Sequence, residues 1–297
     1  MKYLTSKETA EKWGLSERSV RNYCANKRIS GAFLQGKTWM IPETAAKPER
    51  KNKAVSEPTL LDVLMREREA KTSGGIYHKL QIEMTYNSNH IEGSKLTHDE
   101  TRYIFETKTI GRGKAAKVDD IIETVNHFRC MDYIIKTANY KLSESYIKEL
   151  HRLLKSSTSD ADKDWLNVGE YKALPNEVGG NATTSPKKVH GEIAKLISKY
   201  NAARKIDFEK IVKFHQEFER IHPFQDGNGR VGRLIMFKEC LKNNIVPVII
   251  TDDIKFYYYR GLTEWKNDKT YLIETCRAGQ DVVKKYLDYF RIRYVDD

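Results

Sequence analysis

The sequence predicts a mostly helical protein that also carries a small, separate domain at its N-terminus. From Leu60 onward, apolar residues recur at helical spacing and polar residues punctuate them. The first fifty residues differ, because two short helical patterns are followed there by two short strand patterns. One long break, residues 165–189, contains several glycines and prolines and predicts an ordered loop or hairpin. We therefore expect a helical bundle with one β-hairpin, preceded by a small helix-and-strand domain.

The composition is that of a basic globular protein with a sizeable core. The chain has 297 residues, 39% of them hydrophobic, and its 52 Lys and Arg against 41 Asp and Glu give a net charge of +11. Such a charge favours acidic partners: nucleic acid, nucleotides or an acidic protein surface. Lys and Arg that only solvate helix faces explain it equally well.

No membrane-spanning or secretory segment is expected. No stretch reaches the roughly 18 apolar residues that span a bilayer, and residues 1–7 lack the apolar run of a secretory signal. The four cysteines form no CxxC pair, so neither a zinc site nor a disulfide framework is indicated. We expect a cytoplasmic protein without a membrane partner.

Residues 1–46 are expected to form the small domain. A helix over residues 6–13, a tight turn, and a second helix capped by Ser16 are followed by strands expected at residues 29–33 and 37–41. This order is that of a winged helix-turn-helix, and the segment resembles the MerR-like and excisionase-like DNA-binding modules. The first fifty residues hold ten Lys and Arg against five Glu.

The resemblance implies that the second helix enters the major groove of DNA. The residues expected to contact DNA are Arg18, Arg21, Asn22 and Lys37. A vestigial or protein-binding module with ordinary solvated charges is the alternative. A single copy would bind DNA weakly unless the protein forms a homodimer, which the sequence leaves open.

A linker is expected at residues 47–58, and the main domain at residues 59–297. Helix starts are marked by a capping box at Thr97 and by Asp119, Ser143 and Asp207. The chain is expected to end in an amphipathic helix over residues 282–294.

The densest signal is the stretch from Ile221 to Arg233, IHPFQDGNGRVGR. A helix should stop at Pro223, and a second one should start near Gly229 after a turn whose glycines allow close approach to the backbone. The free N–H groups of that second helix form an anion site, and Arg230 and Arg233 lie on one side of its first turn. The carboxylate of Asp226 suits Mg²⁺ on a polyphosphate. The residues alone therefore suggest ATP–Mg²⁺ beside a general base.

The same stretch matches HPFx(D/E)GNGRxxR, the motif of the Fic family, at every fixed position. The resemblance implies a protein adenylyltransferase fold and activity: AMP moves from ATP to a Tyr, Thr or Ser hydroxyl of a target protein or of the chain itself. By that resemblance, His222 is the catalytic base and Asp226 holds Mg²⁺, or Mn²⁺ in its place. The phosphates would be held by Gly227, Asn228, Gly229, Arg230 and Arg233. Relatives that phosphorylate instead replace the turn glycines, so Gly227 and Gly229 favour adenylyl transfer.

A second motif precedes the core, at the end of a helix expected around residues 77–93. Ser88, Glu92 and Gly93 resemble the Fic inhibitory motif (S/T)xxxE(G/N), and Gly93 suits the helix end. The resemblance implies that Glu92 pairs with Arg233 and keeps ATP misaligned. In some relatives this Glu also helps to remove AMP. The alternative is a solvent-exposed Glu before a helix stop.

Two further segments resemble Fic elements. Val178, Gly179, Gly180 and Asn181 resemble the tip of the hairpin, called the flap, that pairs with the target's main chain, although a plain surface hairpin is the alternative. An adenine pocket is expected from the set Tyr258, Tyr259, Leu262 and Asn267, with core packing as the alternative. His215 lies one helix turn from Glu219 but is expected to be structural, since no third metal ligand is nearby.

A second hypothesis for the function remains open. In it, the protein is a DNA-binding transcriptional regulator, and its Fic-like part is a nucleotide sensor.

Overall fold

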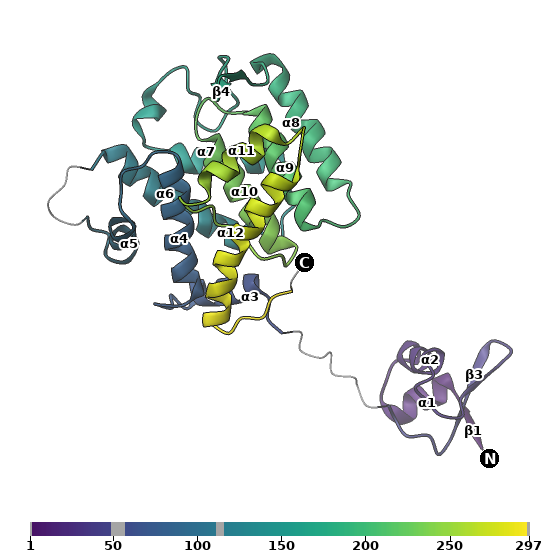
Figure 1. Cartoon of the computed structure of the whole chain (residues 1–297). Helices are drawn as coiled ribbons and strands as arrows, with labels where there is room; N and C mark the ends of the chain where they lie inside the picture. Colours follow the sequence, from purple (N-terminus) through teal and green to yellow (C-terminus); the bar gives the residue numbers. More distant parts are fainter. Residues whose placement is uncertain (1, 49–56, 111–115, 296–297) are drawn as a thin grey trace. The chain divides into compact units, whose positions relative to one another are not determined.

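The computed structural model describes residues 2–48, 57–110 and 116–295 (Figure 1). The chain divides into two compact units, residues 1–57 and 58–297. Most of the linker expected at residues 47–58 lies outside the described residues. Within the described part, every helix is too short or too polar to cross a membrane.

The N-terminal unit contains two helices and a three-stranded antiparallel sheet of order β1-β3-β2. Its elements are β1 (Tyr3–Thr5), α1 (Ser6–Trp13), α2 (Glu17–Ala25), β2 (Phe33–Gln35) and β3 (Thr38–Pro42). Gly14 ends α1 in the left-handed conformation, and Ser16 caps α2 as predicted. A small apolar core with Val20, Cys24 and Ile41 at its centre joins the helices to the sheet.

The strands of this unit differ from the expectation. Residues 29–31 form a bend and a turn, because Gly31 has a φ of +75° and Ile29 is buried in the core. The strand expected at residues 29–33 therefore begins only at Phe33. Strand β1 was not predicted, because three residues are too few to show an alternating pattern. It pairs with β3, with Tyr3 opposite Pro42.

The larger unit is mostly helical, with a hairpin of two short strands between its helices. Its first helices are α3 (Leu60–Glu69), α4 (Ile76–Ile91), α5 (His98–Thr107), α6 (Val118–Thr137) and α7 (Glu144–Lys155). A 3-10 turn η1 (Ser159–Asp162) and the hairpin β4 (Glu177–Val178) and β5 (Asn181–Ala182) follow. The last helices are α8 (Pro186–Asn201), α9 (Phe208–Ile221), α10 (Asn228–Lys242), α11 (Lys255–Glu264) and α12 (Thr270–Tyr289).

Helix α10 lies at the centre of this unit (Figure 1). Nearly every residue from Asn228 to Leu241 is buried, so the helix has no solvated face. Its apolar side chains join the main core with those of α3, α4, α6, α7, α8, α9 and α12. A second core forms where α9 and α10 meet α11 and α12. The first turn of α10 is therefore fixed by a rigid core.

The capping residues place most helix starts as predicted, with two differences. Thr97 forms its capping box with Glu100, and Ser143 and Asp207 cap α7 and α9. Helix α6 is instead preceded by Lys117, because the Asp119 carboxylate accepts the Ser159 N–H at 2.9 Å. The final helix begins at Thr270 and ends at Tyr289, earlier at both ends than the expected 282–294, since its first half is buried in the second core.

Candidate functional site: the turn between α9 and α10

The turn that carries the densest motif is held in a strained conformation. His222 ends α9 with a φ of +52°, in the left-handed region that non-glycine residues rarely adopt. Phe224 is fully buried behind it. The Asn228 side chain accepts the Phe224 N–H and donates to the Phe224 carbonyl, both at 2.8 Å. In this structure the Asn228 amide therefore locks the turn through both its oxygen and its nitrogen.

His222 is a neutral base. Burial lowers the pKa of His222 to about 4, and the charge of Lys172 acts in the same direction, while the carbonyl of Glu219 and nearby carboxylates oppose them. Its Nδ1 has no hydrogen-bond partner among the described residues. At neutral pH the imidazole can therefore accept a proton from a hydroxyl.

Arg233 is bound by the end of α4. Its Nη2 donates to the Glu92 carboxylate at 2.7 Å and to the Ser88 carbonyl at 2.9 Å, and its Nε donates to the Ser88 hydroxyl at 3.1 Å. Gly93 follows the helix with a φ of +95°, which favours glycine. The predicted inhibitory residues thus lie together on the second arginine of the motif.

Gly229 makes room for this contact. A Cβ on Gly229 would lie 2.3 Å from the Glu92 Oε1 and 3.0 Å from the Arg233 Nη1. The bare backbone at this position is therefore required for Glu92 to reach Arg233, in addition to any role toward a phosphate.

Asp226 belongs to a cluster of charges that sequence reasoning missed. The Lys155 ammonium contacts Asp226 at 2.7 Å, Glu123 at 2.6 Å and Asp160 at 2.5 Å. Arg230 is bound by Glu123 and lies 3.5 Å from Asp226. These three carboxylates could together hold a metal ion, but Lys155 already occupies the point between them.

Asp226 alone still fits a magnesium ligand. Burial raises the pKa of Asp226, but Lys155 and Arg230 outweigh it and hold the pKa at about 2. Its side chain is 50% exposed, and its hydrogen bonds to Lys155 and Arg230 both use Oδ2. A single exposed carboxylate, with phosphates and water completing the shell, is how proteins usually hold Mg²⁺.

His151 packs against the turn, and the sequence did not predict this contact. Its ring stacks on Phe224 with the ring centroids 3.9 Å apart. Nε2 lies 3.1 Å from the Asp226 carbonyl, and Nδ1 accepts the Gly169 N–H at 2.9 Å. These partners fix the proton on Nε2. Seventy-five residues separate His151 from Asp226, and no local pattern signals the contact.

The hairpin β4–β5 is closed by a tight turn at two glycines. Gly179 and Gly180 have φ values of +57° and +76°, as a two-residue turn of type I′ requires. Val178 and Asn181, on either side of the turn, are exposed like the two glycines. Both strands pair only with each other among the described residues, so their outer edges can accept another strand.

The four residues predicted for an adenine pocket lie in different environments, although the ring centroids of Tyr258 and Tyr259 are 5.6 Å apart. Tyr258 is 1% exposed, and its hydroxyl lies 2.6 Å from the His215 Nε2. Tyr259 is exposed and lies 3.4 Å from the Ile91 carbonyl at the end of α4. Leu262 packs on the second core, and Asn267 is exposed and donates to Glu264. Of these four residues, Tyr259 is both accessible and close to the inhibitory motif, while His215 is buried and hydrogen-bonded to Tyr258.

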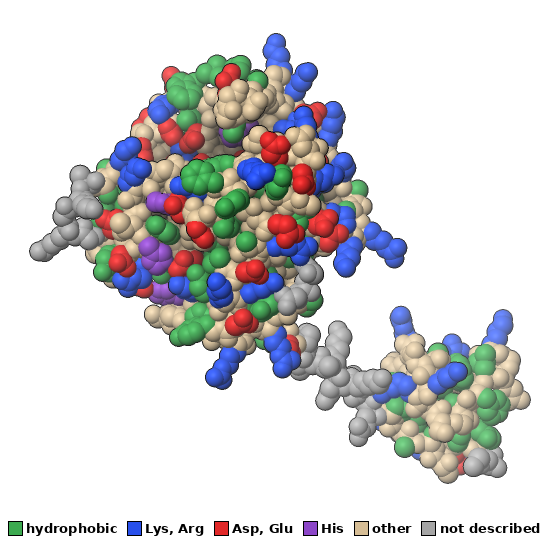
Figure 2. Space-filling model, in the orientation of Figure 1, with side chains coloured by type: hydrophobic (Ala, Val, Ile, Leu, Met, Phe, Trp, Pro, Cys, Tyr) green, Lys and Arg blue, Asp and Glu red, His purple; other side chains and the backbone are tan. Residues whose placement is uncertain are grey.

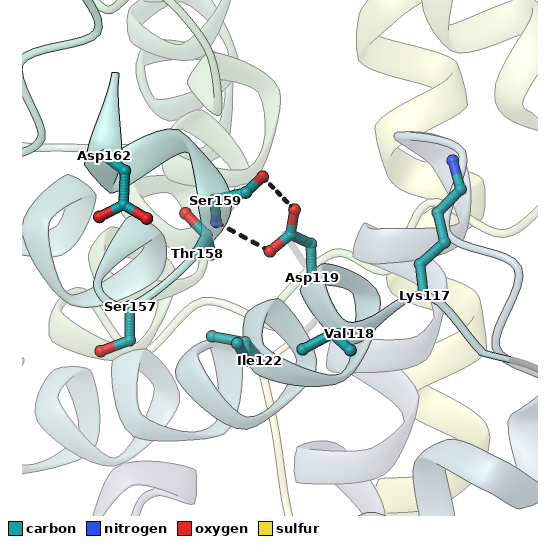
Figure 3. Close-up of a pocket in the computed structure, with 8 residues that line it drawn as sticks. All are labelled: Lys117, Val118, Asp119, Ile122, Ser157, Thr158, Ser159 and Asp162. Carbon is teal, nitrogen blue, oxygen red and sulfur yellow. Dashed lines mark hydrogen bonds between the residues drawn. The ribbon is translucent and has the colours of Figure 1, made fainter. Parts of the chain in front are cut away.

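The larger unit also has a cavity of about 610 Å³ at the start of α6 (Figure 3). It is lined by Lys117, Val118, Asp119, Ile122, Ser157, Thr158, Ser159 and Asp162. Figure 3 shows Ser159 joined to Asp119 by two hydrogen bonds, which fix the η1 turn to α6. None of the predicted site residues lines this cavity.

In the N-terminal unit, the four predicted DNA-contact residues are exposed. Arg18, Arg21 and Asn22 lie on α2, and Lys37 lies at the tip of the β2–β3 hairpin. Arg21 also forms an ion pair with Glu17 at 3.3 Å. Blue side chains predominate over red on the face of this unit drawn in Figure 2.

Comparisons with known proteins find relatives of this chain among protein adenylyltransferases. The chain is 29% identical over 188 residues to protein adenylyltransferase Fic of Drosophila grimshawi and 28% identical over 218 residues to that of Culex quinquefasciatus. These matches cover 60% and 71% of this chain but only 36% and 40% of the two relatives.

Solved structures show the same fold. A Fic domain-containing signaling protein from Bacteroides thetaiotaomicron superposes with a TM-score of 0.64 at 23% identity, covering 80% of this chain and 99% of that one. Fic-1 from C. elegans superposes with a TM-score of 0.61 at 19% identity, covering 78% of this chain and 72% of that one. Residues 141–240, which include the turn, match the family described as Fic/DOC. Residues 141–240 are therefore similar in sequence to the Fic/DOC family, and the larger unit has the fold of solved Fic domains.

Proposed function

We propose that this chain is a protein adenylyltransferase whose activity is repressed by its own helix α4. The hydroxyl oxygen of a target Tyr, Thr or Ser attacks the α-phosphorus of ATP, its proton passes to the His222 imidazole, and pyrophosphate leaves. AMP then remains on the target oxygen. Mg²⁺ on Asp226 would neutralise phosphate charge while it is bound.

One observation carries the proposal. The neutral His222 lies at one end of the turn, and the N-terminus of α10, which suits a phosphate, lies at the other. Arg233, the second arginine of the motif, is bound by the Glu92 carboxylate. While Glu92 occupies Arg233, a phosphate finds fewer guanidinium donors and must compete with the carboxylate for the same positive charge. The two insect relatives, both protein adenylyltransferases by name, support adenylyl transfer as the reaction.

Labelling with α-³²P-ATP and Mg²⁺ tests the proposal. We expect Glu92→Gly to label itself or lysate proteins strongly, wild type weakly, and Glu92→Gly with His222→Ala not at all. Lys95→Gly is the matched control, since Lys95 is exposed just after the same helix and does not contact Arg233. Label from γ-³²P-ATP in place of α-³²P-ATP would refute adenylyl transfer, because only phosphoryl transfer leaves the γ-phosphate on the product.

We further propose residues 1–46 as a winged helix-turn-helix module that binds DNA, joined through residues 47–58 to the catalytic part, residues 59–297. The exposed Arg18 and Asn22 on the second helix favour it. Binding of a labelled random duplex should weaken as salt rises and should fall in Arg18→Ala. The control is Lys12→Ala, because Lys12 lies on α1 and its ammonium already donates to the Glu43 carbonyl. A salt-independent signal, or equal loss in both variants, would refute DNA binding through α2.

A further inference from the structure

The base of the flap contains a buried ammonium group without an ion-pair partner. Lys172 is 3% exposed. Its Nζ contacts two neutral oxygens, Asn176 Oδ1 at 2.6 Å and Thr183 Oγ1 at 2.5 Å, and no carboxylate of the described residues lies within ion-pair distance. Burial alone lowers the pKa of Lys172 to about 8. A buried charge without a counter-charge is costly, which points to a role other than stability.

The two oxygens belong to opposite legs of the flap. Asn176 directly precedes β4, and Thr183 directly follows β5. Thr183 also donates to the Asn176 side chain at 2.5 Å, and its N–H donates to the Asn176 carbonyl at 3.3 Å. Lys172 therefore joins the two sides of the hairpin at its base through hydrogen bonds to Asn176 and Thr183.

The same segment is bonded to the turn that carries His222. The Lys172 N–H donates to the Pro223 carbonyl at 2.9 Å, and the Asn176 amide donates to the Phe224 carbonyl at 3.0 Å. The Leu174 N–H donates to Gln225 at 3.3 Å. Three residues of the flap base thus hold three consecutive residues of the catalytic turn.

We propose that Lys172 is a positioning residue that fixes the flap onto the catalytic turn, so that an extended target segment paired with the flap is presented to His222. This inference rests on the proposed adenylyl transfer. The partner it implies is an extended, strand-like segment that carries a hydroxyl, because the exposed edges of the flap strands offer main-chain N–H and C=O groups to an added strand. The Lys172 charge also lies close enough to lower the pKa of His222, which links the same group to the base.

The test compares Lys172→Met with Lys172→Arg and with Lys187→Met. Methionine keeps most of the buried stem and removes the charge. No carboxylate loses its partner, and Thr183 still donates to Asn176, so the variant should fold. Arginine keeps the charge and the donors. Lys187 is exposed on the first turn of α8 and is the matched control.

Amide hydrogen exchange of the full chain reports on the flap without any transfer reaction. We expect residues 174–183 to exchange roughly tenfold to a hundredfold faster in Lys172→Met, as the loss of charge-assisted hydrogen bonds implies. Exchange should return to the wild-type rate in Lys172→Arg and stay there in Lys187→Met. Unchanged flap exchange in Lys172→Met, or equal loosening in Lys187→Met, would overturn the proposal.

A second measurement separates positioning from general damage. In the Glu92→Gly background, Lys172→Met should bind ATP–Mg²⁺ with unchanged affinity while α-³²P labelling of lysate proteins falls at least about tenfold, in line with the same bond energies. A fall in ATP affinity that matches the fall in labelling would overturn a role confined to the target. If Glu92→Gly itself labels nothing, the proposed reaction fails, whereas the exchange experiment still decides the role of Lys172.

Discussion

Acid should unfold the larger unit at a pH where most globular proteins remain folded, because it holds four neutral histidines, three of them fully buried and His222 partly buried. Burial, the largest cause in each case, lowers the pKa of His127 and His215 to about 3 and that of His151 and His222 to about 4. An unfolded histidine takes up its proton near pH 6.5. These groups therefore stabilise the fold fully above pH 6.5, and that contribution is lost as the pH falls toward 4.

The magnitude follows from counting protons. Near pH 5.5 the unfolded chain binds almost four protons that the folded chain refuses. Glu219 acts in the opposite direction, since burial raises its pKa to about 8 and the folded chain keeps a proton that the unfolded chain has released. The net difference is about three protons, and each contributes roughly 1.4 kcal/mol per pH unit. The free energy of unfolding should fall by about 4 kcal/mol per pH unit, which exhausts a typical stability within two or three units.

Urea denaturation followed by far-UV circular dichroism at a series of pH values measures this slope. We expect His127→Gln, which removes one fully buried histidine, to lower the slope by about one proton, or roughly 1.4 kcal/mol per pH unit. His190→Gln removes an exposed histidine and is the control. A free energy of unfolding that is flat between pH 7 and pH 5 would refute the reasoning, as would an equal effect of the two substitutions.

Three further predictions concern single contacts. Gly229→Ala should destabilise wild type more than the Glu92→Gly variant, with a coupling of about 1 to 3 kcal/mol in a double-mutant cycle by urea denaturation; additive effects would contradict the steric argument. Lys155→Met should lower the free energy of unfolding by about 3 kcal/mol, because three carboxylates lose their shared cation. A smaller loss than the same substitution causes at an exposed lysine would contradict this prediction. Gly180→Val should raise hydrogen exchange at the flap tip, since a branched side chain is strained at positive φ by about 1 to 2 kcal/mol; unaltered exchange would exclude the type I′ turn.

Local patterns in the sequence were enough to place most of the fold. Capping side chains bond the backbone within three residues of themselves, so Thr97, Ser143 and Asp207 mark helix starts without knowledge of the rest of the chain. The final helix was misplaced because the expectation started it only at residue 282, although its first half already has a buried face at Leu272 and Cys276 and an exposed Glu274.

The candidate site was predictable where its residues are neighbours in sequence. The turn from His222 to Arg233 is one contiguous motif, and Glu92 was paired with Arg233 only through a resemblance. Lys155 and His151 could not be found in this way, because each lies more than seventy residues from Asp226 and no spacing rule relates them to it. The structure also gives Asn228 a turn-locking contact that its place in the motif does not signal.

The binding of Arg233 by α4 makes nucleotide affinity a measure of helix opening. Glu92 and a phosphate would compete for the same guanidinium, so only the fraction of molecules with Arg233 released can bind ATP productively, and the apparent dissociation constant is the intrinsic one divided by that fraction. A charge-assisted bond of roughly 1.5 to 3 kcal/mol leaves about 1 to 10% of molecules open. Any partner that prefers the open end of α4 would then raise ATP affinity by up to about a hundredfold without touching the nucleotide.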